Sequence, residues 1–137
     1  MTNLPNTMLG ALLLGPEQIE IQELKLERPE SGEIVLAVRA ATTCGTDVKV
    51  FKRGGHPRML KVPSLFGHEV AGTVAALGKG VSGFKEGDDV VVANSVPCKK
   101  CEYCANGQEN LCKNLVYLNG AFAEYLRVPK NFVRGNG

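Results

Sequence analysis

Residues 33–41 read EIVLAVRAA, an apolar run rich in strand-forming residues that follows a loop containing Pro29, Ser31 and Gly32. Runs of the same kind recur along the chain, over residues 8–14, 19–26, 70–77, 90–93 and 122–128. Only residues 46–53 and a short turn near residues 101–106 have a helical pattern. Short strands about 10–15 residues apart, with few helices, favour a mainly β fold, either an open barrel or a sandwich.

Length and composition fit a single domain of this kind. The chain has 137 residues, and we expect one domain to span residues 1–137. Its 16 Gly and 7 Pro, with no Trp, agree with a turn-rich β fold rather than a helical bundle. Sixteen Lys and Arg against fourteen Asp and Glu leave a net charge of +2, so we expect no nucleic-acid or anionic-membrane partner. A nucleotide-binding α/β half and a substrate-binding half do not both fit in this length.

The longest apolar stretch, residues 8–14 (MLGALLL), is too short to cross a membrane. Crossing a bilayer takes about 20 apolar residues, and this stretch has neither a basic region before it nor a small-residue cleavage site after it. We therefore expect no membrane partner and no signal peptide, and we expect a cytoplasmic protein. Because thiols stay reduced in that compartment, the five Cys predict metal ligands or reactive groups before disulfides.

Four of the cysteines lie within one short segment. It reads Cys98-Lys-Lys-Cys101-Glu-Tyr-Cys104, and Cys112 follows after seven further residues. Four thiolates at this spacing supply a tetrahedral shell with no open position, which is what a structural zinc ion requires. We therefore expect a zinc-binding lobe over about residues 95–115. Three lysines of the lobe are expected to offset part of the thiolate charge: Lys99, Lys100 and Lys113.

Two other interpretations of this segment compete with zinc. Reduced thiols without a metal would leave the tight spacing unexplained. An iron–sulfur cluster is the more serious alternative, because the first three spacings match the bacterial ferredoxin pattern. That pattern ends C-x3-C-P, whereas here seven residues precede Cys112 and Lys113 follows it, so the spacing favours zinc.

A second group of candidate ligands combines Cys44 with His68 and Glu69. Taken singly, an isolated Cys or His is more often a structural residue than a ligand. Together the three offer a thiolate, an imidazole and a carboxylate, which can form a catalytic zinc site with an open position for water or substrate. Asp47 and Glu69 are candidates to orient the ligands through hydrogen bonds.

Five motifs, in this order along the chain, resemble those of the zinc-dependent medium-chain dehydrogenases, the alcohol, sorbitol and threonine dehydrogenase group. Residues 44–47 (CGTD) resemble C-G-[ST]-D, and residues 67–81 are similar to G-H-E-x2-G-x5-G-x2-V. Residues 87–90 (GDDV) resemble G-D-R-V, with Asp89 in place of the usual Arg. The clustered cysteines resemble the structural-zinc lobe of that family, and residues 120–125 (GAFAEY) are similar to G-G-F-A-E-Y.

The resemblance implies a chaperonin-10-like (GroES-like) catalytic domain, a partly open β-barrel with a few short helices and a zinc-binding lobe. In that family a separate Rossmann domain, which we expect to be absent from these residues, binds NAD or NADP. The implied reaction is hydride transfer between an alcohol or polyol and the nicotinamide, with zinc as a further cofactor. Family members are often dimers or tetramers, so a second copy of the chain is among the implied partners.

The resemblance also gives roles to the residues of the second group. It implies a catalytic zinc ion held by Cys44, His68 and either Glu69 or a Cys, Asp or Glu from a later segment. Thr46 would take the alkoxide proton and pass it on, and Asp47 would fix the tautomer of His68. These five residues are the expected catalytic residues.

One position departs from the family. Many members carry a His five residues after the Cys, where it completes the proton relay to solvent, but this chain carries Lys49. Lys49 could carry the proton instead if its pKa were lowered, but we favour a solvated surface charge at this position. It belongs to a basic run without an acid between residues 48 and 67, which we also expect to form a solvated face: Lys49, Lys52, Arg53, Arg58 and Lys61.

The leading hypothesis is therefore the catalytic-domain portion of a zinc-dependent NAD(P) alcohol or polyol dehydrogenase, inactive by itself. It predicts one zinc ion bound tightly at the four-cysteine lobe and a second, weakly bound or absent, near Cys44. The main alternative is a stand-alone zinc-stabilised β-barrel that acts as a binding module without chemistry. A less favoured alternative is an iron–sulfur electron carrier.

Overall fold

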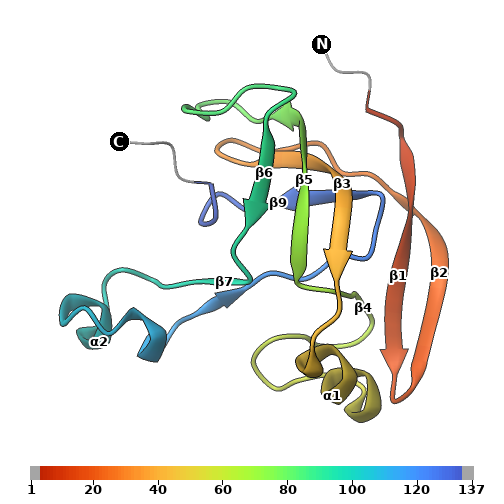
Figure 1. Ribbon diagram of the computed structural model, residues 1–137, viewed down its shortest axis with the longest axis horizontal. Coiled ribbons are helices and arrows are strands. Elements are labelled where there is room, and N and C mark those ends of the chain that lie inside the picture. Colours follow the sequence, from red (N-terminus) through yellow and green to blue (C-terminus); the bar gives the residue numbers. More distant parts are fainter. Residues whose placement is uncertain (1–3, 134–137) are drawn as a thin grey trace.

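The chain folds into short antiparallel strands joined by turns and three short helical segments, over residues 4–133, which the computed structural model describes (Figure 1). The strands are β1 (Thr7–Gly15), β2 (Gln18–Lys25), β3 (Ile34–Thr42), β4 (Ser64–Leu65), β5 (Glu69–Leu77), β6 (Asp89–Val92), β7 (Ser95–Val96), β8 (Val116–Tyr117) and β9 (Tyr125–Val128). The helical segments are α1 (Gly45–Arg53), α2 (Glu102–Ala105) and the 3-10 turn η1 (Glu109–Leu111). None of these helices is long and apolar enough to cross a membrane.

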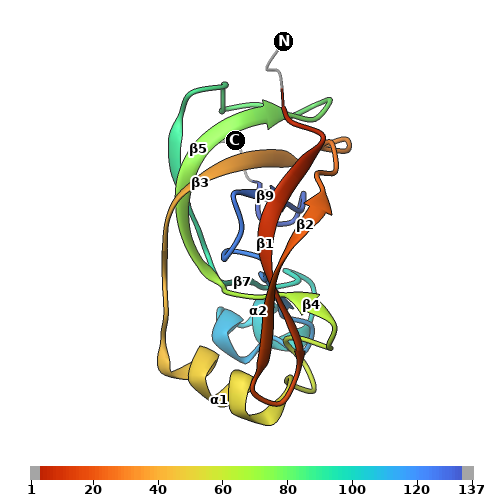
Figure 2. The same ribbon diagram turned by 90° about the vertical axis from the view of Figure 1, so that its right-hand side faces the viewer.

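Two antiparallel sheets curve around the core without closing into one continuous cylinder. β6, β5, β3 and β9 form the larger sheet in that order, and β2, β1 and β4 form the smaller one. Figure 2 shows β3 and β5 bending behind β1 and β2, and Met8 of β1 and Val35 of β3 belong to one buried cluster. The architecture confirms the prediction of a mainly β, partly open barrel.

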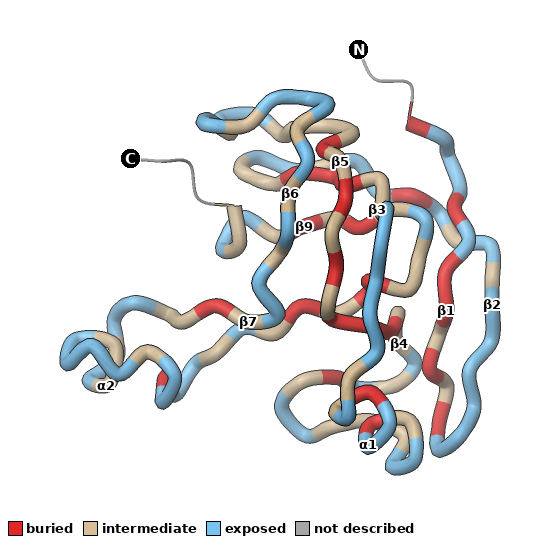
Figure 3. The backbone as a smooth tube through the Cα atoms, in the orientation of Figure 1, coloured by how far each residue is buried: buried red, intermediate tan, exposed pale blue. Residues whose placement is uncertain are grey.

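The core consists of side chains that the strands turn inward. Leu13 of β1 and Val35 and Leu36 of β3 are fully buried. Residues 34–36 are buried on both faces of the sheet, because β3 lies in the middle of the larger sheet and contacts the smaller one. β2 is an edge strand, and most of its side chains are exposed (Figure 3). Burial of an apolar side chain such as Leu36 stabilises the fold by about 1.5–3 kcal/mol.

The segment that precedes β9 joins the two sheets. Ala11 of β1 donates its amide to the carbonyl of Phe122 (2.8 Å), and the amide of Glu124 donates to the carbonyl of Leu9 (3.0 Å). The chain then continues as β9 and pairs with β3 of the larger sheet. The strand predicted over residues 122–128 therefore begins later than expected, because its first residues form hydrogen bonds with the smaller sheet instead.

The turn after β5 contains GKGVSG over residues 78–83, which fits the glycine spacing G-x-G-x-x-G. In a dinucleotide site such a loop opens a helix whose N-terminus holds the pyrophosphate. Here residues 78–88 form turns that lead directly into β6. This loop therefore connects two strands of the barrel and lacks the helix that nucleotide binding requires.

The four-cysteine segment forms a lobe that extends away from the barrel (Figure 1). It runs from β7 through α2 and η1 to β8, and two residue pairs form the ladder between β7 and β8. Val96 and Cys112 are its buried residues, and the others are half-buried or exposed. Because the lobe buries so little apolar surface, it needs stabilisation of another kind, such as a metal ion.

Candidate metal centres

The first centre begins at the N-terminus of α1, where Cys44 is the capping residue. Its Sγ accepts a hydrogen bond from the amide of Thr46 (3.3 Å), and its own amide donates to Oδ2 of Asp47 (3.0 Å). This reciprocal arrangement is a capping box, which satisfies donors at the start of the helix. It also fixes the direction in which the Cys44 thiol points.

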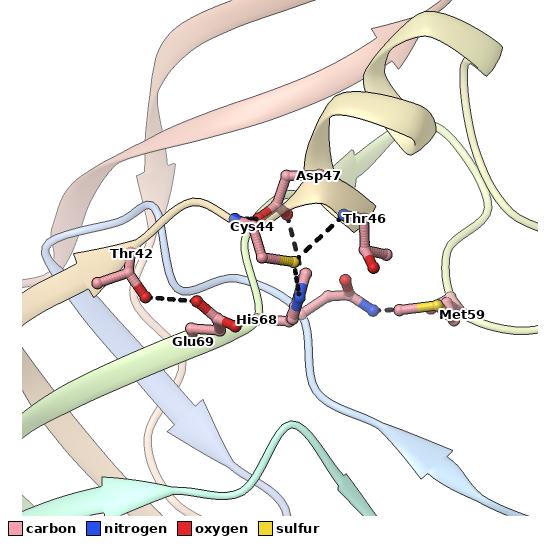
Figure 4. Close-up of polar contacts among 8 residues, drawn as sticks. Thr42, Cys44, Thr46, Asp47, Met59, His68 and Glu69 are labelled. Atoms are coloured by element: carbon pink, nitrogen blue, oxygen red, sulfur yellow. Dashed lines mark hydrogen bonds and ion pairs between the residues drawn. The ribbon is translucent and has the colours of Figure 1, made fainter.

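His68 reaches the same point from the residue before β5. The preceding Gly67 has a φ of +90°, a conformation that favours glycine. A Cβ at this position would lie 2.8 Å from the ring of Phe122, so a side chain does not fit between the two segments. His68 is 4% exposed, and its Nε2 lies 3.1 Å from Sγ of Cys44 (Figure 4).

The buried carboxylate of Asp47 sets the tautomer of His68. Asp47 is 2% exposed, and its Oδ1 lies 3.1 Å from Nδ1 of the ring. Oδ1 has no other hydrogen-bond partner, so it is satisfied only if Nδ1 carries a proton that points toward it. A buried carboxylate oxygen without a hydrogen bond would lower the stability of the fold. The proton therefore belongs on Nδ1, which leaves the lone pair of Nε2 facing the sulfur of Cys44.

Glu69 adds a carboxylate to this pair. One of its oxygens lies within 4.8 Å of the Cys44 sulfur and of a His68 ring nitrogen, so the three ligand atoms form one cluster. A thiolate, an imidazole and a carboxylate are donors that a catalytic zinc ion prefers. The 3.1 Å between sulfur and Nε2 is within about 0.5 Å of the separation expected across a tetrahedral zinc ion. The residues present therefore fit zinc.

This centre opens onto a cleft with a volume of about 260 Å³. Thr42, His68 and Glu69 line the cleft together with Val91 and Val92 of β6. The wall of the cleft is polar at His68 and Glu69 and apolar at Val91 and Val92. Such a lining suits a small molecule that carries a hydroxyl or carbonyl oxygen.

The remaining residues predicted near this centre lie on α1 and the loop after it. Thr46 lies near Cys44 at the start of the helix (Figure 4), and it is half-buried. Lys49 is exposed and forms no ion pair with the described residues. The other members of the basic run are exposed too, in agreement with a solvated face: Lys52, Arg53, Arg58 and Lys61.

The sequence interpretation missed Thr42, whose hydroxyl donates a hydrogen bond to Oε2 of Glu69 (Figure 4). Thr42 is the last residue of β3, and the ladder places it directly opposite Glu69, the first residue of β5. The spacing of the two residues in the chain does not reveal this pairing. Only the register of the two strands could have pointed to it.

The second centre is the four-cysteine lobe. Its sulfur–sulfur distances are 4.0 Å for Cys98–Cys104, 3.5 Å for Cys101–Cys104 and 3.9 Å for Cys101–Cys112. A tetrahedral zinc ion with Zn–S bonds of about 2.3 Å places its sulfurs about 3.8 Å apart. All four sulfurs lie within 4.8 Å of one another. The lobe is therefore shaped for one tetrahedral ion, and the residues present fit zinc.

Backbone amides and burial separate the pKa values of these cysteines. The amide of Lys100 donates a hydrogen bond to Cys98 and lowers the pKa of that thiol to about 6. The amide of Cys104 lowers the pKa of Cys101 in the same way. Burial raises the pKa of the Cys104 thiol to about 12. The cluster therefore favours a thiolate at Cys98 and a protonated thiol at Cys104, and a bound cation would displace the remaining thiol proton.

Two lysines of the lobe form ion pairs with acids. Lys99 pairs with Glu109, and Nζ of Lys113 lies 2.8 Å from Oε1 of Glu102. Each of these two lysines has a carboxylate partner, and the expectation that they offset part of the thiolate charge stays a prediction. Lys100 acts on the cysteines through its amide, as described above.

Known proteins similar to this chain carry the same kind of domain. Residues 30–134 match the alcohol dehydrogenase GroES-like domain. The chain is 33% identical over 135 residues to the sorbitol dehydrogenase of Bacillus subtilis strain 168, which covers 94% of this chain and 38% of that protein. It is 38% identical over 115 residues to the L-threonine 3-dehydrogenase of Pyrococcus horikoshii, which covers 80% of this chain and 33% of that protein.

A solved structure leads to the same family. A zinc-binding dehydrogenase from Sinorhizobium meliloti 1021, bound to NADP, superposes with a TM-score of 0.83 at 28% identity, over 92% of this chain and 37% of that one. The chain thus spans between a third and two fifths of the length of the curated relatives named above. The domain match includes both candidate metal centres. The chain therefore belongs to the family of alcohol dehydrogenase GroES-like domains of the zinc-dependent medium-chain dehydrogenases.

Proposed function

We propose that this chain is the metal- and substrate-binding portion of a zinc-dependent NAD(P) alcohol or polyol dehydrogenase. The observation that supports this most is the convergence of Cys44, His68 and Glu69, of which His68 and Glu69 line a cleft of about 260 Å³. The relatives named sorbitol and L-threonine dehydrogenase support a small substrate with a hydroxyl group. The four-cysteine lobe would hold a second, purely structural zinc ion.

We further propose that residues 1–137 form one GroES-like domain with the structural-zinc lobe at about residues 95–115. The nicotinamide cofactor would be bound by a Rossmann domain outside these residues. Support comes from the NADP-bound Sinorhizobium meliloti dehydrogenase, which this chain matches over 37% of its length. Without a hydride acceptor fixed over the cleft, the chain alone should have no turnover.

A bound zinc ion would polarise the substrate oxygen and lower the pKa of its hydroxyl. The residues of the chain prepare the site for that task. Asp47 keeps the proton of His68 on Nδ1, so that Nε2 can serve as a ligand. Thr46, close to Cys44 at the start of α1, supplies a hydroxyl that can accept the substrate proton and pass it on.

The proposal also covers the partners of the protein and its location in the cell. The substrate is a small alcohol or polyol, and neither nucleic acid nor a membrane is a partner. We place the protein in the cytoplasm, because all five cysteines are free and two thiolate centres need a reducing compartment. A homo-oligomer is the proposed assembly of the longer enzyme, to be measured by light scattering.

The test combines metal content with nicotinamide reduction. Purified without chelator, the chain should hold one zinc ion tightly and a second weakly, and Cys44→Ser should remove only the second. The protein encoded by the complete gene should reduce NAD or NADP with alcohols or polyols, whereas the 137 residues should not. Bound zinc without turnover in the longer protein would favour the binding module. Bound iron with visible absorption would favour the electron carrier.

A further inference from the structure

Thr42 lies outside the ligand set, yet it contacts one of the ligands directly. It pairs with Glu69 at the end of the ladder between β3 and β5. In an antiparallel ladder the Cβ atoms of such a pair are about 4.5–5.5 Å apart, so the two side chains can meet. They do meet here, because the Thr42 hydroxyl donates a hydrogen bond to Oε2 of Glu69.

Glu69 needs such a contact because it directly follows His68. Successive side chains of an extended segment point to opposite faces, so neighbouring residues do not by themselves turn toward one ion. Nevertheless a Glu69 oxygen lies within 4.8 Å of the Cys44 sulfur and of a His68 nitrogen. Among the described residues, Thr42 is the one side chain that forms a hydrogen bond with this carboxylate.

The chemistry of a threonine suits this task. Its neutral hydroxyl occupies a lone pair of Oε2 and leaves Oε1 and the full negative charge available to a cation. A lysine or arginine at position 42 would compete with the cation by neutralising the carboxylate. The β-branched side chain of Thr42 also has few rotamers, so its hydroxyl keeps one direction. We propose that Thr42 is a positioning residue that presents Glu69 to the ion held by Cys44 and His68, an inference that rests on the proposed zinc centre.

The test measures zinc affinity in the intact 137-residue chain, without substrate or nicotinamide. Thr42→Val removes the hydroxyl and keeps the shape, and Thr42→Ser keeps the hydroxyl. Thr43→Val is the matched control, because Thr43 is exposed and its hydroxyl forms no hydrogen bond with the described residues. Chelator competition should show the weaker zinc ion bound about 10–100-fold less tightly in Thr42→Val. Thr42→Ser and Thr43→Val should stay close to wild type, and the tight zinc ion should be unaffected in all three.

A double-mutant cycle separates positioning from a general loss of stability. Glu69→Gln should weaken the same zinc ion, and adding Thr42→Val to it should cost little more, because the two residues act through one carboxylate. Additive losses, an unchanged affinity in Thr42→Val, or a wild-type chain that binds a single zinc ion would each overturn the inference. None of these measurements depends on turnover. A longer protein that oxidises alcohols while Thr42→Val binds zinc normally would retain the proposed function and reject this inference alone.

Discussion

Oδ1 of Asp47 lies 3.1 Å from Nδ1 of His68, while Oδ2 of the same carboxylate accepts a hydrogen bond from the amide of Cys44. One buried side chain therefore orients two candidate ligands that come from different parts of the fold. Cys44 lies at the start of α1, and His68 lies just before β5. The carboxylate of Asp47 thus fixes the tautomer of His68 and caps the start of α1 at the same time.

Asp47→Asn should therefore disable the Cys44 centre while preserving the fold. If the amide oxygen of Asn keeps the bond to the Cys44 amide, its NH2 group faces Nδ1, and the ring proton must move to Nε2. We expect zinc affinity at this centre to fall about 10–100-fold and the free energy of unfolding to fall by about 1–3 kcal/mol. Chelator competition and denaturant titration measure the two effects. Asp88→Asn, which alters a bond to the Lys85 amide, is the control, and equal zinc affinity in both variants would contradict the prediction.

Gly67→Ala should destabilise the protein more than Gly87→Ala. Both glycines have nearly the same positive φ, +90° and +91°, so both substitutions carry similar backbone strain. A Cβ at Gly67 meets the ring of Phe122 at 2.8 Å, whereas a Cβ at Gly87 meets nothing within 4 Å. We expect a loss of about 1–2 kcal/mol for Gly87→Ala from strain and about 1–3 kcal/mol more for Gly67→Ala from overpacking. Urea denaturation measures both, and equal losses would show that the Phe122 contact relaxes freely.

Removal of zinc from the lobe should unfold the lobe and leave the barrel folded. The lobe buries few residues and is closed at its base only by the two-pair ladder between β7 and β8, so its order depends on the metal. Cys112→Ser or a strong chelator should change the near-ultraviolet circular dichroism of Tyr103 and Tyr117 in the lobe. The far-ultraviolet signal of the β-sheets should persist, and Cys44→Ser should leave the tyrosine signal unchanged. A single cooperative loss of both signals would disprove the independence of the lobe.

Zinc binding by the lobe should release protons and weaken as the pH falls. Burial raises the pKa of Cys104 to about 12, so at neutral pH zinc must displace its proton. The Lys100 amide lowers the pKa of Cys98 to about 6, so a proton on Cys98 competes with zinc mainly below that pH. Each displaced proton lowers the apparent affinity about tenfold per pH unit. Calorimetry in buffers of different ionisation enthalpy should show at least one proton released near pH 7.5, and a pH-independent affinity from pH 6 to 8 would refute this account.

Local patterns predicted most of the fold and both candidate metal centres. Apolar runs revealed the long strands: β5 turns alternate side chains toward the core, whereas residues 34–36 of β3 are buried on both faces. The helix expected over residues 46–53 is α1, whose cap motif lies within the CGTD segment. The four cysteines and the His68-Glu69 pair were visible because their spacing is itself the chemical requirement.

Features that depend on strand register were not visible in the sequence. β4, β7 and β8 have two residues each, too short for any periodicity. The contact of Thr42 with Glu69 requires knowledge that β3 pairs with β5 in one particular alignment. The ion pair of Lys99 with Glu109 likewise exists because the lobe folds back on itself. Which residues form such pairs depends on how the strands and the lobe come together in the fold, and not on the spacing of the residues along the chain.

The segment before β9 has a consequence for how the protein is made. Its residues bond to β1, and the amides of Gly120 and Ala121 donate to the carbonyl of Gly67, next to His68. These partners precede it in the chain by more than 50 residues, so the barrel cannot close until residues 120–124 have left the ribosome. Contacts between such distant segments make folding slow, and the unpaired edges stay open to other chains meanwhile. The backbone beside His68 can therefore gain these two hydrogen bonds only after residues 120–121 have been synthesised, when β1 and β3–β6 already exist.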